Sequence, residues 1–142
     1  DRLNWIEQAC KKMEQEGDIR IVRTSGLWET QAMYITDQAS FLNGVCEVGG
    51  RSCSQIYSCQ ILSRRVCTDI GKVRTPLEPM ELLDRLQSIE NELGRVKVVD
   101  KGPRNIDLDI LLYEGKSLKN ERLTLPHPLM LEREFVLRPL CE

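Results

Sequence analysis

The segment 102–113, GPRNIDLDILLY, constrains the fold more than any other part of the chain. Side chains two positions apart in a strand lie on the same face, so Asp107 and Asp109 are expected roughly 7 Å apart on one face. The apolar side chains that alternate with them lie on the opposite face and can pack on a core: Leu108, Ile110 and Leu112. The pattern therefore predicts a strand with one carboxylate face and one buried face.

Two carboxylates held side by side repel each other unless a positive charge lies between them. Mg²⁺ is suited to this position because it prefers oxygen ligands and is commonly held by one or two carboxylates together with substrate phosphates. An isolated D-x-D pattern is more often a solvent-exposed strand face. In this chain, however, basic side chains lie before and after the strand: Arg95, Lys97, Lys101, Arg104, Arg122, His127, Arg133 and Arg138. Carboxylates beside such cations are typical of phosphoryl transfer, which favours a nucleotide site.

The common glycine-rich nucleotide motifs do not occur in the chain. No segment matches G-x-x-x-x-G-K-[ST] or G-x-G-x-x-G, and Gly49-Gly50-Arg51 does not replace them. A nucleotide bound by this chain is therefore expected to be held outside the P-loop and dinucleotide-binding folds.

Hydrophobic periodicity predicts a mixture of helices and strands. Apolar residues at three- and four-residue steps predict one helix that ends near Gly17 and another that begins near Pro79 and ends near Gly94. Strands are predicted at 19–25, 41–47 and 107–113. Prolines limit the tail after residue 122 to short elements. The strands are too few and too widely separated for a doubly wound sheet, so we expect an α+β fold with helices packed on an antiparallel sheet.

Composition excludes several classes of function. At 142 residues the chain is expected to be one domain, and its net charge of −2 argues against non-specific nucleic-acid binding. No stretch approaches the roughly 18 apolar residues that a membrane-spanning helix needs. The six cysteines form no C-x-x-C pair, which favours unpaired thiols in a reducing compartment. We therefore expect a cytoplasmic protein, with a mitochondrial location as the alternative.

Several motifs together resemble the hydroxymethyldihydropterin pyrophosphokinases. GPRNIDLDILLY followed by RLTLPHPLMLEREFVLRPL is similar to the signature region of that family. The upstream segments TSGLWET, FLNGV and LLDRLQSIENELGR follow in the family's order, and Asp1-Arg2-Leu3 is similar to the end of its opening glycine turn. The resemblance covers the whole chain except one internal block.

The resemblance implies a fold and an activity. The fold would be a ferredoxin-like antiparallel sheet with helices packed on it, lacking the family's first strand. The activity would be transfer of a diphosphate from ATP to the hydroxymethyl group of 6-hydroxymethyl-7,8-dihydropterin, releasing AMP, in folate biosynthesis. Two Mg²⁺ ions would act with ATP as co-substrate. The partners would be these small molecules, without nucleic acid or membrane, and the chain is expected to be an incomplete domain that can be fused to other folate-pathway modules.

The resemblance also implies roles for individual residues. Asp107 and Asp109 would hold both metal ions and act in catalysis with two basic residues of the preceding loop, Arg95 and Arg104. The residues implied to bind ATP are Gln87, Lys97, Ile110, Thr124, His127 and Arg133. The residues implied to bind the pterin are Thr30, Phe41, Asn43 and Phe135, with Phe135 stacking on the ring and Asn43 hydrogen bonding to it.

The internal block 48–72 has no counterpart in the family pattern. It holds three of the six cysteines, has four basic residues against one acidic residue, and shows no sustained period. Deleting it joins Glu47 to Val73 and restores an uninterrupted family-like segment. The codons of its first and last residues are compatible with splice signals, so we favour a translated, unspliced intron. A genuine surface insertion is the alternative, since loops tolerate insertions at modest entropic cost.

Two other functions compete with the pyrophosphokinase. One is a catalytically inactive fragment or non-enzymatic module of a multifunctional folate-synthesis protein. The other is an RNA-binding ferredoxin-like domain. The acidic charge and an aromatic content of 5% without a stacking pair on a strand argue against RNA binding.

Overall fold

The computed structural model describes residues 2–31, 40–49, 57–63, 77–94, 105–113 and 116–141. The helices in these ranges are α1 (Arg2–Gln15), α2 (Pro79–Glu92) and α3 (Glu134–Leu140). The strands are β1 (Arg20–Thr24), β2 (Trp28–Thr30), β3 (Phe41–Gly49), β4 (Tyr57–Ser63), β5 (Asp107–Tyr113), β6 (Leu118–Lys119) and β7 (Thr124–Leu125). The chain is thus α+β, as the sequence predicts.

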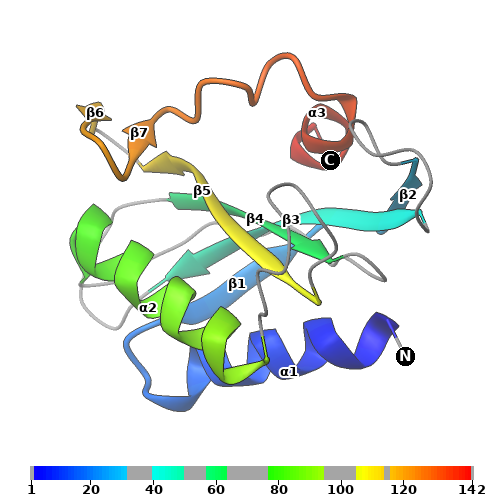
Figure 1. Ribbon diagram of the computed structural model, residues 1–142, viewed down its shortest axis with the longest axis horizontal. Helices are drawn as coiled ribbons and strands as arrows, with labels where there is room; N and C mark the ends of the chain where they lie inside the picture. Colours follow the sequence, from blue (N-terminus) through cyan, green and yellow to red (C-terminus); the bar gives the residue numbers. More distant parts are fainter. Residues whose placement is uncertain are drawn as a thin grey trace.

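The larger sheet is antiparallel in every pair of neighbouring strands. Its order is β1-β3-β4-β5, and β2 pairs with the first residues of β3 beside β1. A separate two-stranded ribbon is formed by β6 and β7. Figure 1 shows α1 and α2 on one face of the larger sheet and α3 on the other, near β2 and β3. The sheet therefore separates two different environments.

Helices α1 and α2 form because the spacing of their apolar residues and the residues at their termini both favour a helix. In α1, Ile6, Ala9 and Met13 are buried at three- and four-residue steps. Helix α2 begins with Pro79 in its first turn and a capping box between Glu78 and Glu81. Both helices are followed by a glycine with a positive φ of 76°, Gly17 after α1 and Gly94 after α2, a conformation that costs glycine little.

Two apolar clusters lie on the two sides of the sheet. The larger one joins α1 and α2 to the sheet through Cys46 of β3 and through Leu108 and Ile110 of β5. The smaller one contains Val45 of β3, Leu111 of β5 and, from the C-terminal segment, Met130 and Val136. Because Val45 and Cys46 are neighbours in β3 but belong to different clusters, β3 is buried on both faces.

Most elements predicted from the sequence are confirmed. The helices end next to the predicted glycines, and strand 107–113 coincides with β5. One side chain of β5 was placed wrongly: Leu112 packs against the smaller cluster, not the face of Leu108 and Ile110. The register with β4 shifts between Ser58 and Cys59, and this irregularity interrupts the alternation of faces. The strand β2 was not predicted, since it has only three residues.

Part of the atypical block 48–72 lies inside the sheet. Its first two residues end β3, and residues 57–63 form β4 between β3 and β5. The sequence predicted no strand there, because the block shows no sustained period. These seven residues are therefore not a surface loop in this structure. No helix in the described ranges has the length and apolarity needed to cross a membrane.

Candidate functional site

The two aspartates of β5 lie on the side of the sheet that α3 covers. Asp107 and Asp109 are half-buried, whereas Leu108 and Ile110 between and after them are buried against α1 and α2. The face of the aspartates continues to Leu111, which packs in the smaller cluster. The predicted carboxylate face and buried face are both present, and the carboxylates lie on the side of the sheet that carries the smaller cluster.

Asn43 and Asp107 lie in one row across the sheet. Asn43 of β3 pairs with Leu62 of β4, and Leu62 pairs with Asp107 of β5. Since neighbouring strands lie about 4.8 Å apart, the two residues are separated by roughly 10 Å across β4. Asn43 lies two positions before Val45 and therefore faces the same side of the sheet as the aspartates.

The side chain of Asn43 is fixed by the edge strand β2. It is 1% exposed, and its Nδ2 donates to the carbonyl oxygen of Trp28 at 3.2 Å and to Oγ1 of Thr30 at 2.6 Å. Thr30 pairs with Phe41, and both side chains are half-buried. The structure thus brings together three of the four residues implied to bind the pterin: Thr30, Phe41 and Asn43.

The fourth of these residues, Phe135, comes from α3. It is half-buried and packs against the cluster that contains Val45 and Leu111. The carbon Cζ of Arg133, just before α3, lies 5.7 Å from the centre of the Phe135 ring. Phe135 therefore lies on the same side of the sheet as Asn43 and the aspartates, carried by a different element.

His127 is attached to β5 through its backbone. Its N–H donates to the carbonyl oxygen of Leu111 at 2.8 Å, and its ring Nδ1 accepts from the N–H of Leu129 at 3.2 Å. Because Nδ1 is an acceptor, the proton of the neutral ring is assigned to Nε2, which leaves that nitrogen as a hydrogen-bond donor. This geometry suits a ring that donates to an anionic oxygen.

The charge state of His127 depends on its surroundings. Partial burial lowers the pKa of the imidazole below its usual value of 6.5, and the nearby positive charge of Arg133 lowers it further. Two positive charges close together repel, so a phosphate placed near both groups relieves the repulsion. The structure therefore brings together two of the residues implied to bind ATP phosphates.

Three further residues implied to bind ATP lie on α2, β7 and β5. Oε1 of Gln87, on α2, accepts from Nη2 of Arg122 at 3.2 Å, and Arg122 also forms an ion pair with Asp84. Thr124 is half-buried in β7. The side chain of Ile110 is 2% exposed and lies in the larger cluster, so it is not accessible to a ligand.

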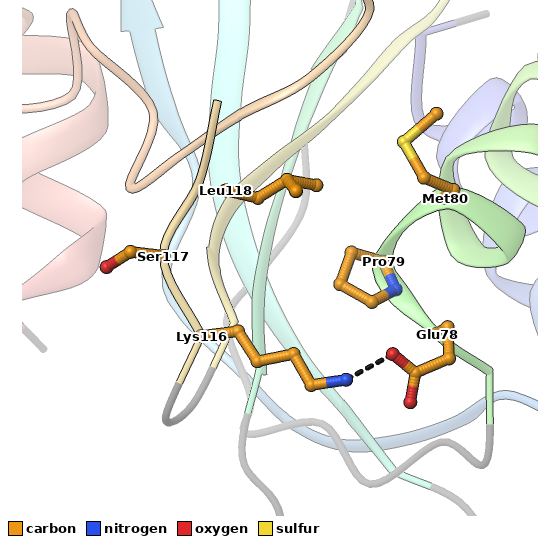
Figure 2. Close-up of a pocket in the computed structure, with 6 residues that line it drawn as sticks. All are labelled: Glu78, Pro79, Met80, Lys116, Ser117 and Leu118. Carbon is orange, nitrogen blue, oxygen red and sulfur yellow. Dashed lines mark hydrogen bonds and ion pairs between the residues drawn. The ribbon is translucent and has the colours of Figure 1, made fainter. Parts of the chain in front are cut away.

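A pocket of about 370 Å³ lies between the start of α2 and β6. Figure 2 shows the residues that line it, with Lys116 and Glu78 forming an ion pair at its edge: Glu78, Pro79, Met80, Lys116, Ser117 and Leu118. None of the site residues that were predicted from the sequence is among those that line this pocket. The side chain of Asn120 contacts the sulfur of Met80, which further joins the β6–β7 ribbon to α2.

The basic loop lies outside the described residues. Arg95, Lys97 and Arg104 therefore remain predictions, as does Lys101. Among the residues that are described, no group of three or more His, Cys, Asp or Glu side chains is arranged to hold a metal ion. Two half-buried carboxylates on one strand face nevertheless fit Mg²⁺, because that ion takes its remaining ligands from substrate phosphates and water.

Glu90 is a residue of this site that the sequence analysis missed. It belongs to α2, is 1% exposed, and its Oε1 accepts from the backbone N–H of Leu108 at 2.6 Å. Leu108 lies between Asp107 and Asp109, so this carboxylate holds the start of β5 against α2. The available signal was the position of Glu90 next to Ile89, on the apolar face of the helix, where a charged residue needs a specific partner.

Comparison with known proteins gives a consistent result. The model of the family described as 7,8-dihydro-6-hydroxymethylpterin-pyrophosphokinase matches residues 50–142. The folic acid synthesis protein fol1 of Pneumocystis carinii is 44% identical over 142 residues, which are 100% of this chain and 16% of that protein. The 2-amino-4-hydroxy-6-hydroxymethyldihydropteridine pyrophosphokinase of Bacillus subtilis is 37% identical over 100% of this chain and 70% of its own length. The mitochondrial folate synthesis bifunctional protein of Pisum sativum is 36% identical over 100% of this chain and 22% of its own length.

Replacing Glu90 tests its hold on β5. We expect Glu90→Ala to lower the free energy of unfolding by about 1–3 kcal/mol, because the buried N–H of Leu108 loses its acceptor. Glu90→Gln keeps an acceptor oxygen and is expected to lose less. Urea unfolding measures both changes. Glu92→Ala, which removes an exposed carboxylate two residues later in α2, is the matched control and should have little effect. Equal losses in Glu90→Ala and Glu92→Ala would contradict the assignment.

The lowered pKa of His127 predicts a pH-dependent stability. Below the usual pKa of 6.5 the unfolded chain binds a proton that the folded chain still excludes, so the free energy of unfolding should fall as the pH falls through this window. The chain has no second histidine to obscure the effect. His127→Asn keeps an acceptor for the N–H of Leu129 and should flatten the dependence between about pH 7.5 and pH 5.5 in urea unfolding. Identical slopes in the two proteins would contradict the prediction.

Proposed function

Because this chain belongs to the 7,8-dihydro-6-hydroxymethylpterin-pyrophosphokinase family, we propose that it transfers diphosphate from ATP to 6-hydroxymethyl-7,8-dihydropterin. The products are the pterin diphosphate and AMP. The observation that carries the proposal is the row across the sheet in which Asn43 and Asp107 lie roughly 10 Å apart. This separation matches a substrate whose ring lies at one end of the row and whose reacting oxygen lies toward the other.

The pterin ring is proposed to bind at the β2–β3 end of this row. A flat, polar heterocycle is recognised by an aromatic face together with a hydrogen-bonding amide. Phe135 supplies the face, Asn43 supplies the amide, and Thr30 and Phe41 complete the pocket. The anchored side chain of Asn43 supports this role, since a preorganised group loses little conformational freedom on binding.

The triphosphate is proposed to bind between β5 and the C-terminal segment. Asp107 and Asp109 would hold two Mg²⁺ ions, which supply positive charge to the phosphates when bound. His127 donates from Nε2 to a phosphate oxygen, and Arg133 binds a second one. Gln87, Thr124 and the backbone of Ile110 contact the adenosine end, while Arg95, Lys97 and Arg104 close over the phosphates. The proximity of His127 and Arg133 supports this placement.

The reaction is an in-line substitution at the β-phosphorus of ATP. The hydroxymethyl oxygen forms the new bond to this phosphorus, and the bond from the phosphorus to the oxygen bridging the α- and β-phosphates breaks. AMP leaves with that oxygen, and the hydroxyl proton is released. The chain contributes position and charge: the pterin pocket aligns the hydroxyl oxygen, and the cationic side chains neutralise charge on the transferring group.

The proposal extends to fold and context. We propose a ferredoxin-like fold, supported by the two helices that cover one face of an antiparallel sheet. The chain spans 16% of the length of its Pneumocystis relative, and the Pisum relative is named bifunctional, so fusion to other folate-pathway domains is proposed as well. We propose a cytoplasmic location; the alternative, mitochondria, matches the name of the Pisum relative.

The carboxylates of β5 provide the test of activity. We expect the protein to release AMP from ATP only when both the pterin alcohol and Mg²⁺ are present. Asp107→Asn and Asp109→Asn should each lower this rate at least ~100-fold, because they remove the charge that holds the metal. Chromatographic separation of AMP from ADP measures the reaction. Glu7→Gln, an exposed carboxylate on α1, is the matched control. ADP as the product would indicate an ordinary kinase, and unchanged rates in both variants would show that the metal site lies elsewhere.

We also propose that residues 48–72 are a translated intron. Without them β4 is absent, and another segment has to pair with β3 and β5, because unpaired backbone groups inside a sheet are costly. The row of Asn43 and Asp107 keeps its spacing only when that segment takes the place of β4 between the two strands. Sequencing the mature transcript across the codons of Glu47 and Val73 tests the proposal. Adjacent codons are the expected result. A transcript that retains the block would contradict it and make β4 a genuine strand of the protein.

A further inference from the structure

Arg138 of α3 lies over the indole ring of Trp28 of β2. The guanidinium carbon is 5.4 Å from the centre of the ring, within the range of a cation–π contact. The guanidinium is oriented by Glu134, one turn earlier in α3: Nε donates to Oε1 at 2.8 Å and Nη2 lies 2.5 Å from the same oxygen. These two contacts with one carboxylate oxygen favour this orientation of the planar group above the ring.

Trp28 belongs to the row that contains Asn43 and Asp107. It pairs with Asn43 across the β2–β3 ladder, and its carbonyl oxygen accepts one of the hydrogen bonds from the Asn43 side chain. Directly paired residues of antiparallel strands project to the same face, so the indole lies on the side of the sheet that faces α3. A displacement of Trp28 therefore moves an anchor of Asn43.

The position of Trp28 depends on contacts with its ring. Within the described residues its Nε1 is buried and has no hydrogen-bond acceptor. A buried donor without an acceptor costs free energy, so the indole is held here by packing and by the cation above it, against that cost. The contact with the guanidinium of Arg138 therefore contributes to the orientation of the Trp28 ring.

The same contact joins the two halves of the proposed pterin pocket. One half, on β2 and β3, carries Thr30, Phe41 and Asn43; the other half, on α3, carries Phe135. Helix α3 has seven residues and packs on the sheet through the smaller cluster, and the contact of Arg138 with Trp28 lies between α3 and β2. A shift of about 1 Å between the halves is enough to impair binding of a ring that stacks on one half and hydrogen bonds to the other.

We propose that Arg138 and Trp28 are positioning residues for the pterin, joining α3 to β2 so that Phe135 stacks on the ring while Asn43 hydrogen bonds to its edge. This inference rests on the proposed function. It adds two residues to the site that do not themselves touch the substrate in the proposal. A merely structural contact would affect the stability of the fold, whereas a positioning contact affects the KM of one substrate selectively.

The first test is steady-state kinetics of R138M. Methionine keeps much of the length of the side chain but removes its charge and planar group. We expect the KM for the pterin to rise about threefold to fivefold, the range that loss of a cation–π contact produces. The kcat and the KM for ATP should stay within about twofold. R138K, which keeps the charge but not the guanidinium plane, should show a smaller rise.

The matched control is the cation–π contact of Lys116 with Tyr113. Nζ of Lys116 lies 5.3 Å from the centre of that ring, beside the pocket of Figure 2 and away from the pterin residues. K116M removes a cation–π contact and an ion pair, as R138M does. We expect K116M to leave the KM for the pterin unchanged. An equal rise in both variants would show that loss of stability, not positioning, is responsible.

The second test uses the fluorescence of Trp28 itself. Trp5 is the chain's other tryptophan, so the variant W5F leaves Trp28 as the single indole. In W5F we expect the pterin to change the Trp28 emission, and in W5F/R138M we expect the titration midpoint to rise by the same factor as the KM. Because the side chain of Arg138 is 57% exposed, its replacement leaves the core intact.

The outcomes separate this inference from the proposed function. A wild-type protein that releases no AMP with the pterin, and whose W5F variant shows no emission change, would overturn both. An active wild type together with an unchanged KM and an unchanged Trp28 titration in R138M would overturn the positioning role alone. A higher pterin KM in R138M, with K116M unchanged, is the result we expect.

Discussion

The antiparallel pairing of β3, β4 and β5 is the constraint on which the rest of this structure depends. It places Asn43 and Asp107 in one row and sets their separation by two strand spacings. It also divides the side chains of β3 and β5 between two clusters, so that one face of the sheet packs against α1 and α2 while the other is left for a ligand and α3. The backbone hydrogen bonds thus determine the dimensions of the candidate site before any ligand contributes.

Electrostatics then distinguishes the two ends of that row. The β2–β3 end is lined by aromatic rings, a threonine and a buried amide, whereas β5 carries half-buried carboxylates at its start and contacts the backbone of His127 at Leu111. In the proposed function, a metal-bound polyphosphate would place its metal on the carboxylates and its oxygens near Arg133 and the neutral ring of His127. The proposed function thus assigns the neutral heterocycle and the charged tail of its substrates to different ends of this row.

Several parts of the fold were predictable from the sequence because local and tertiary preferences agree. Helices α1 and α2 have apolar residues at helical spacing, and each ends at a glycine that adopts a positive φ. Strand β5 alternates carboxylates with aliphatic residues, and its bounds were predicted correctly. The face on which Leu112 lies was predicted wrongly, because an irregular register with β4 interrupts the alternation of side chains. Strand β4 lacks a pattern of its own and exists through its pairing with β3 and β5.

The sequence by itself determined the class of fold, the carboxylate strand and the family, because each of these is recorded in short, specific patterns of neighbouring residues. Only the tertiary structure decided that Asn43 and Asp107 share a row, that Glu90 holds the strand of the aspartates, and that Arg138 reaches Trp28. The physical reason is that these contacts join residues from different strands and helices. Their partners are chosen by strand order, register and helix docking, and those depend on how the whole chain packs.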